Sequence, residues 1–368
     1  MAVVDSVCEC LGGLDPQASG RDFGSVPPTP YAIAGPFDPP WWMRGGRVQT
    51  ALAGLKFRRT ARSPMQEAAR EVLLDAGTGA DGHPVRLKGY HSPHPAPKGL
   101  AIFFHGWEGS QDSTYVQTTA RRLFARGLSV FRLVYRDHGD THDLNPGLFF
   151  APHFAEVLEA TRQAAKLAQG LPVYVIGFSL GGNYALRVAA RHEQEGVRGL
   201  SHVFAISPVV DPLEAAPLVD EFPLIRRYFL KKWTRSLAAK EAAFPDAYDF
   251  GDALRTRRVM ELTDWILPRY SQWPDRRGYF NGYKIGRDML RDVRTPTTLI
   301  TAEDDPIIPP DHARALELSD AVTLIVTRTG GHNGFFDSLT GPAWYERYIW
   351  ATLGLADERS GWREASDA

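Results

Sequence analysis

The sequence predicts an α/β fold: a mostly parallel sheet of about eight strands, flanked by helices and carrying a helical cap insertion. Short apolar runs alternate with helical patterns before residue 206 and again after residue 297. Between about 211 and 291, helical patterns follow one another without strands. Repeated β-α alternation is typical of a parallel sheet with helices on both faces. The strand-free stretch is then an insertion between core strands.

The central unit of this fold is predicted between Leu171 and His192. Residues 171–176 form an apolar run without alternation, as in a strand buried on both faces. Residues 177–181 follow as Gly-Phe-Ser-Leu-Gly, and apolar residues then recur at helical spacing. Strand, tight turn and helix are the context in which G-x-S-x-G forms a nucleophile elbow. The alternative is a serine in an ordinary loop between a strand and a helix.

The other elements are assigned in chain order. Residues 1–35 are predicted to be an irregular leader, 36–355 the main domain, and 356–368 a charged tail. In residues 36–55 we expect an extended arm that packs Trp41 and Trp42 onto the main body and ends in a short helix. The alternative is that this Trp pair lines a ligand pocket. A hairpin at a sheet edge is expected at 71–76 and 85–90. Further strands are expected at 99–104, 128–134, 202–206, 297–301 and 322–326, and helices at 115–126, 154–168, 312–318 and 343–353.

Composition excludes several classes of protein. The net charge of −1 gives no electrostatic case for nucleic acid. No run of 18 apolar residues occurs, so we predict no membrane span. The two cysteines, Cys8 and Cys10, make a poor disulfide framework, and no secretory signal is recognisable, which favours the cytoplasm. The basic, aromatic segment 225–235 is expected to be a solvated helix face, with contact to anionic lipid as the alternative.

A serine nucleophile requires a base and an orienting acid, and in this type of fold both follow the serine in chain order. His332 lies in a Gly-rich loop after the last predicted strand. Asp305 lies in the loop after the preceding strand, three residues before Ile308-Pro309, and is preferred over its neighbour Asp304. We therefore predict Ser179, Asp305 and His332 as the catalytic residues.

An oxyanion hole requires two preset N–H groups. We expect the backbone N–H groups of Leu180 and Trp107 to supply them, with His105 bracing the loop. Glu108, His138 and Phe178 are candidates for the substrate pocket. Apolar cap residues, including 265–267, indicate an apolar substrate.

The polar segment 136–143 is the alternative site to consider, because it holds two histidines and three aspartates. A metal ion is one interpretation. However, His138 and His142 are four residues apart in a Gly-broken loop, so their spacing does not direct both toward one ion. A polar wall of the pocket is the preferred interpretation, and we predict neither a metal nor another cofactor.

Several of these segments together resemble the YheT-like α/β-hydrolases. The similar segments are the Pro-Pro-Trp-Trp-Met-Arg and Gln-Thr residues of the arm (39–44, 49–50), and residues 105–110, 177–183, 304–306 and 331–335. The resemblance implies an α/β-hydrolase fold and a serine esterase or lipase-like enzyme with Ser179, Asp305 and His332 as its triad. Residues 136–139 and the longer cap depart from the family pattern, and both belong to the expected pocket wall.

The predicted function is therefore cleavage of a small carboxylic ester with an apolar acyl or alcohol part, through an acyl-enzyme on Ser179. Thioesterase, lysophospholipase and peptidase activities use the same triad and stay open. A non-catalytic binding protein is the alternative from another class. The sequence makes no prediction of oligomeric state.

Overall fold

A computed structural model describes residues 29–58, 62–79 and 82–355. The two cysteines, the charged tail and most of the predicted leader lie outside these residues.

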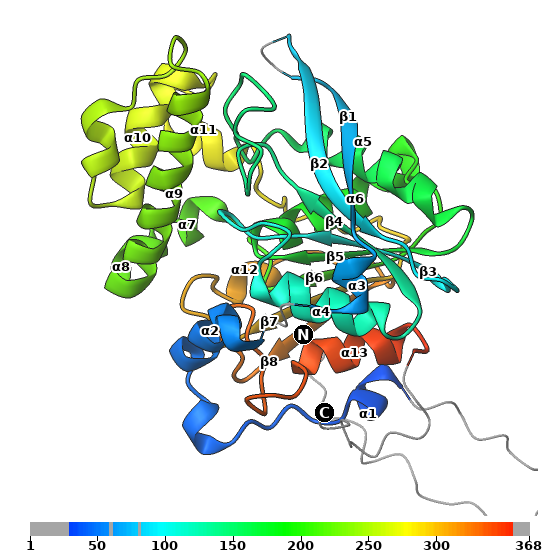
Figure 1. Ribbon diagram of the computed structural model, residues 1–368. Coiled ribbons are helices and arrows are strands. Elements are labelled where there is room, and N and C mark those ends of the chain that lie inside the picture. Colours follow the sequence, from blue (N-terminus) through cyan, green and yellow to red (C-terminus); the bar gives the residue numbers. More distant parts are fainter. Residues whose placement is uncertain (1–28, 59–61, 80–81, 356–368) are drawn as a thin grey trace, which may run out of the picture.

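The core of the molecule is one eight-stranded sheet with the order β1-β2-β4-β3-β5-β6-β7-β8 (Figure 1). Strands β3 to β8 are parallel, whereas β2 runs antiparallel to β1 and to β4. The predicted hairpin is thus confirmed at the sheet edge. The strand bounds are Arg70–Thr78 (β1), Pro84–Ser92 (β2), Gly99–Phe104 (β3), Leu128–Val134 (β4), Val173–Phe178 (β5), Leu200–Ile206 (β6), Thr297–Ala302 (β7) and Val322–Thr327 (β8).

Helices cover both faces of the sheet because the central strands are apolar on both sides. Side chains at alternate positions of a strand point to opposite faces. Ile102 and Phe104 of β3 accordingly pack with α5 (Phe154–Ala165) and α6 (Leu180–Glu195). Phe103 packs on the other face with α4 (Thr114–Phe124) and α13 (Trp344–Thr352). The two apolar clusters between these layers support the loops at the carboxyl ends of the strands.

The helical insertion, residues 211–291, lies between β6 and β7. Its helices are α7 (Pro212–Ala215), α8 (Leu218–Glu221), α9 (Pro223–Ala243), α10 (Val259–Tyr270) and α11 (Arg276–Asn281). Helices α8 to α11 stand together at one side of the sheet in Figure 1. Beyond the insertion, the predicted helix 312–318 is only the single turn α12 (Asp311–Arg314). The prediction overestimated its length.

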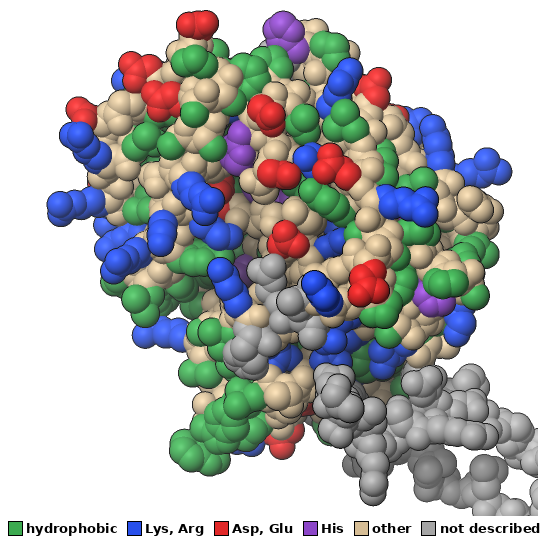
Figure 2. Space-filling view, in the orientation of Figure 1, with side chains coloured by type: hydrophobic (Ala, Val, Ile, Leu, Met, Phe, Trp, Pro, Cys, Tyr) green, Lys and Arg blue, Asp and Glu red, His purple; other side chains and the backbone are tan. Residues whose placement is uncertain are grey.

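The N-terminal arm differs from its prediction in two respects. Residues Pro30–Ala34 form a short helix, α1, within the segment that we expected to be irregular. Trp41 is 81% exposed and Trp42 is 47% exposed, so this pair does not pack onto the main body. Hydrophobic side chains protrude at the lower left of Figure 2, where Figure 1 shows the segment before α2 (Gly46–Gly54). Phe37 contacts Phe335 and Trp344 instead. The arm continues through α2 to α3 (Pro64–Glu67).

Candidate active site

Ser179 lies at the turn between β5 and α6 and has φ 56° and ψ −117°. A positive φ is rare for a residue with a side chain and costs on the order of 1–3 kcal/mol. The tightness of the turn explains its glycines. A Cβ at Gly177 would overlap the main-chain oxygen of Gly181, and one at Gly181 would overlap that of Phe104. The predicted nucleophile elbow geometry is therefore present, with the serine side chain partly exposed.

His332 and Asp305 form a buried hydrogen-bonded pair. The Nδ1 atom of His332 lies 2.9 Å from Oδ2 of Asp305. The other carboxylate oxygen, Oδ1, accepts the backbone N–H groups of Ile307 at 2.8 Å and Ile308 at 3.0 Å. An Nδ1–H group that donates to Asp305 leaves Nε2 of the imidazole with its lone pair, the form that can accept a proton.

Asp304 has a different role. Its Oδ1 atom accepts the backbone N–H of Gly331 at 2.9 Å, and its Oδ2 atom accepts the hydroxyl of Thr329 at 2.8 Å. Asp304 thus braces the loop that carries the histidine, while Asp305 contacts the imidazole. The preference for Asp305 agrees with this geometry.

The arm also holds the histidine loop, which the sequence reasoning missed. The backbone N–H of His332 donates to the hydroxyl of Thr50 at 2.9 Å. The buried amide of Gln49 donates to the carbonyls of Met43 and Phe336, both at 2.8 Å, and accepts the N–H of Phe336 at 2.8 Å. The Gln-Thr pair at residues 49–50 could have indicated this contact. In the sequence it is part of the family resemblance, but the resemblance alone does not show what the two side chains bind.

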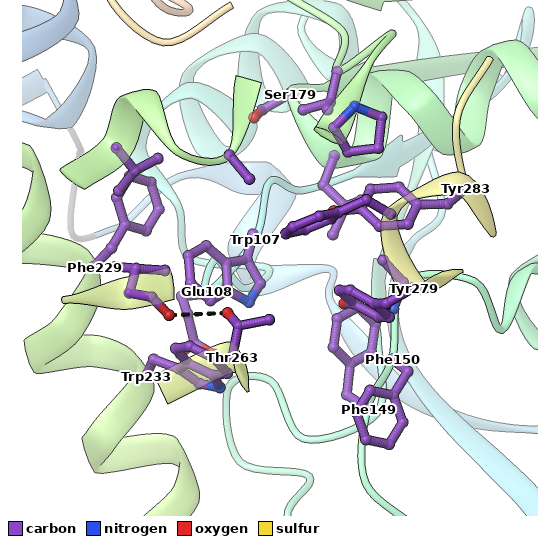
Figure 3. Close-up of a pocket in the computed structure, with 18 of the residues that line it drawn as sticks. Trp107, Glu108, Phe149, Phe150, Ser179, Phe229, Trp233, Thr263, Tyr279 and Tyr283 are labelled. Carbon is purple, nitrogen blue, oxygen red and sulfur yellow. Dashed lines mark hydrogen bonds between the residues drawn. The ribbon is translucent and has the colours of Figure 1, made fainter. Parts of the chain in front are cut away.

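Ser179 and His332 both line one cavity between the sheet and the helical insertion. Figure 3 shows this cavity with Ser179 at its edge. Its volume of about 140 Å³ is close to that of an engineered protein cavity that holds benzene. Aromatic side chains form much of its wall, and Ile266 and Leu267 add the apolar surface expected from the insertion. The aromatic lining residues are Trp107, Phe149, Phe150, Phe229, Trp233, Tyr279, Phe280 and Tyr283. Trp107 stacks on Phe229 of α9 with ring centroids 5.2 Å apart.

Trp107 and Leu180, the two expected oxyanion-hole residues, also line this cavity. Leu180 is the first residue of α6, and the first N–H groups of a helix have no acceptor within it. The backbone of Gly106 lies against Ser179, because a Cβ built on this glycine would be 3.3 Å from the serine Cβ. The loop after β3 thus approaches the serine as expected.

Phe178 is the exception among the predicted pocket residues, and its assignment was wrong. It is fully buried and packs against Tyr115 and Tyr345. These residues belong to the face of the sheet that α4 and α13 cover. Phe178 points to the same face of the sheet as Ile176, two residues earlier in β5, so the phenylalanine does not line the cavity.

Glu108 and His138 do line the cavity, as predicted. Burial raises the pKa of Glu108 to about 8, although nearby Lys232 opposes this shift. Burial lowers the pKa of His138 to about 3. At neutral pH both groups are therefore uncharged, and they form a polar but neutral part of the wall.

A buried ion pair joins this wall to the insertion. Nζ of Lys240 on α9 lies 2.9 Å from Oδ1 of Asp137, and both side chains are nearly inaccessible to solvent. The carbonyls of His142, Asn145 and Gly147 also lie within hydrogen-bond distance of the ammonium group, whose three N–H bonds they share with Asp137. Burial raises the pKa of Asp137 to about 6, and the Lys240 charge acts in the opposite direction. Lys240 therefore fixes the loop after β4 against α9.

The remaining histidines of this region have structural partners. His105 is buried, with Nδ1 2.8 Å from the carbonyl of Gly106 and Nε2 accepting the N–H of Tyr135 at 3.4 Å. This arrangement fits the expected bracing role. Nδ1 of His138 faces the carbonyl of Arg136, and Nε2 of His142 faces the hydroxyl of Ser236. Within the described residues, no three His, Cys, Asp or Glu side chains gather as a metal site.

Residues 101–344 match the family model described as the alpha/beta hydrolase family, and the chain belongs to that family. It is similar to the Escherichia coli protein YheT, which is named as an esterase. The two are 27% identical over 75% of this chain and 83% of YheT. The monoacylglycerol lipase of Saccharomyces cerevisiae is 24% identical over 82% of this chain and 69% of that protein.

Among solved structures, the 2,6-dihydroxy-pseudo-oxynicotine hydrolase shares the fold with a TM-score of 0.52 at 20% identity, over 78% of this chain and 68% of that one. No helix in the described part of the chain is long and apolar enough to cross a membrane.

Proposed function

We propose that this protein is a serine hydrolase that cleaves carboxylic esters through an acyl-enzyme on Ser179. The observation that carries the proposal is the Asp305–His332 hydrogen bond of 2.9 Å at a cavity that Ser179 also lines. The esterase and lipase names of relatives over most of the chain support it.

The proposed reaction uses these groups in two halves. Nε2 of His332 takes the Ser179 proton as Oγ attacks the ester carbonyl carbon. The carbonyl oxygen becomes negative, and the backbone N–H groups of Leu180 and Trp107 stabilise it. The imidazolium, held by Asp305, then protonates the leaving alcohol. In the second half, His332 activates water, which releases the acid and restores the serine.

Substrate class is proposed from the wall of the cavity. Its aromatic and aliphatic residues favour an ester with an apolar acyl or alcohol part. We assign the helical insertion the role of a cap that shields the reacting carbonyl from bulk water. The low cysteine content is consistent with a cytoplasmic enzyme.

The test is labelling by a fluorophosphonate together with turnover of p-nitrophenyl esters. We expect the wild-type protein to be labelled once, at Ser179, and the variant Ser179→Ala to lose both labelling and turnover. Adding a thioester and a peptide amide of the same acyl group distinguishes esterase from thioesterase and peptidase activity. A folded wild-type protein that is neither labelled nor active would contradict the proposal.

A further inference from the structure

Glu108 and His138 are two of the polar residues of the cavity that the proposed triad does not use. Glu108 belongs to the turn after β3, in which the N–H of Gly109 donates to the carbonyl of Gly106 at 2.9 Å. Its backbone has a φ of 55°, which is strained for a residue with a side chain. Nζ of Lys232 on α9 lies 2.5 Å from the main-chain oxygen of Glu108 and holds this conformation. The turn therefore keeps a carboxyl group at the cavity at some energetic cost.

That carboxyl group has no hydrogen-bond partner among the residues that the structure describes, although the cavity around it is mostly apolar. Glu108 is half-buried, so its carboxyl group is open to a ligand that enters the cavity. Because burial raises its pKa to about 8, the group is a neutral acid at pH 7. It can then donate through its O–H and accept through its carbonyl oxygen.

His138 supplies the complementary group. Its side chain is almost fully buried, and Nδ1 lies 2.8 Å from the carbonyl oxygen of Arg136. Nδ1 must carry the proton that this hydrogen bond requires, and the low pKa keeps the ring neutral. Nε2 is therefore an acceptor, and within the described chain it has no hydrogen-bond partner.

The chemistry of these two groups selects among possible ligands. A neutral acid that donates and an imidazole nitrogen that accepts match a hydroxyl, which both accepts and donates. A cationic ligand is disfavoured because Lys232 and Lys240 already bring positive charge to this wall. The hydroxyl must also be close to the reacting bond. Gly106, which lies against Ser179, precedes Glu108 by only two residues, a reach of about 7 Å.

We propose that Glu108 and His138 form a subsite that binds a hydroxyl group carried by the ester substrate a few bonds from the scissile carbonyl. The subsite rests on the proposed hydrolase function, since it acts on the same bound ester. The enzyme would then prefer hydroxylated esters over apolar esters of the same shape.

The test compares two pairs of esters that differ by a hydroxyl in place of a methyl. The first pair, 3-hydroxypropyl butyrate and butyl butyrate, carries the change on the alcohol. The second pair, ethyl 3-hydroxybutyrate and ethyl 3-methylbutyrate, carries it on the acyl group. We expect kcat/KM to favour the hydroxylated member of one pair about tenfold, the size of one net hydrogen bond.

Three variants assign the preference to Glu108. Glu108→Leu should reduce the ratio to about one, whereas Glu108→Gln, which still donates and accepts, should retain most of it. Glu67→Leu, at an exposed glutamate remote from the cavity, is the matched control and should keep the ratio. Fluorophosphonate labelling of each variant shows that Ser179 and the fold are intact.

The outcomes separate the two proposals. A labelled wild-type enzyme with ratios near one for both pairs, or a ratio that survives in Glu108→Leu, overturns the subsite and leaves the esterase intact. If neither labelling nor hydrolysis of any ester occurs, the hydrolase function fails, and the subsite fails with it.

Discussion

At the scale of single residues, the adjacent aspartates Asp304 and Asp305 make different contacts with the loop that carries His332. Asp304 binds the backbone of the loop, and Asp305 binds the imidazole. Adjacent residues of the same chemistry therefore differ in function because the turn after β7 brings their carboxylates to different partners. Substitution at each position should separate their effects.

We expect Asp305→Asn to reduce kcat by about 10⁴-fold, because an amide that donates to Nδ1 would favour the wrong tautomer of His332. Asp304→Asn keeps one carbonyl acceptor for Gly331 or Thr329 and should lower the free energy of unfolding by about 1 kcal/mol, with a loss of activity below about tenfold. Steady-state kinetics and urea unfolding of both variants provide the measurement. Equal kinetic losses in the two variants would contradict the assignment of Asp305.

Glu108 gives a pH dependence at the same scale. It follows Trp107, whose N–H is proposed to face the developing oxyanion. When Glu108 ionises, a negative charge stands beside the ester oxygen that becomes negative, and this repulsion destabilises the transition state. We therefore expect kcat to fall as the pH rises through about 8, and to remain level there in Glu108→Gln.

Four other ionisable side chains lie near Glu108. Lys232 and Lys240 approach from α9, and Asp137 and His138 approach from the loop after β4. Burial places the pKa of Asp137 at about 6 and that of His138 at about 3, both below the pH range of the test. A wild-type profile that matches that of Glu108→Gln above pH 7 would contradict the prediction.

At the scale of secondary-structure elements, α9 both forms the cavity wall and anchors the loop after β4. Phe229 and Trp233 face the cavity, while Lys240, further along the same helix, binds Asp137. The same loop is bound to α5 by the buried Arg136–Glu156 pair at 2.6 Å. Two ion pairs therefore set the position of the segment that contributes His138.

We expect Lys240→Met to destabilise the protein by about 3–5 kcal/mol, because it leaves the Asp137 carboxylate buried without its partner. The double variant Asp137→Leu/Lys240→Met removes both charges and should recover much of this loss. Lys231→Met, on the exposed face of the same helix, is the matched control. Urea unfolding followed by tryptophan fluorescence measures all three, and a Lys240→Met variant as stable as Lys231→Met would contradict the role of the pair.

At the scale of the whole molecule, the cavity arises where the inserted helices meet the carboxyl ends of the strands. Its apolar wall combines residues from the loops after β3 and β4 with residues from α9 and α10. An acyl chain bound in this cavity would transfer its apolar surface from water to an aromatic wall, which is favourable. The gain is about 0.8 kcal/mol for each buried methylene.

For p-nitrophenyl esters, we accordingly expect kcat/KM to rise from acetyl to butyryl by up to about fourfold per methylene. The leaving group is the same throughout, so the change reports the acyl part alone. A profile that falls steadily from acetyl onward would show that the acyl group does not bind in the apolar part of the cavity.

The overall architecture was predictable because buried parallel strands and amphipathic helices leave strong periodic patterns in the chain. The predicted positions of Ser179, Asp305 and His332 followed from their loops after particular strands. The errors concern packing between distant segments. Trp41 and Trp42 are as apolar as any core residue, and nothing local marks them as exposed. Phe178 was assigned by its proximity to Ser179, whereas the pleat of the strand sends it to the opposite face.

The contacts between the arm and the histidine loop have a consequence for folding. Thr50 and His332 are 282 residues apart in the sequence, and Gln49 and Phe336 are 287 residues apart. Contacts between such distant segments form slowly, because a long loop must close before they can be made. The brace of the imidazole should therefore form after the local strand and helix contacts that lie between the two segments.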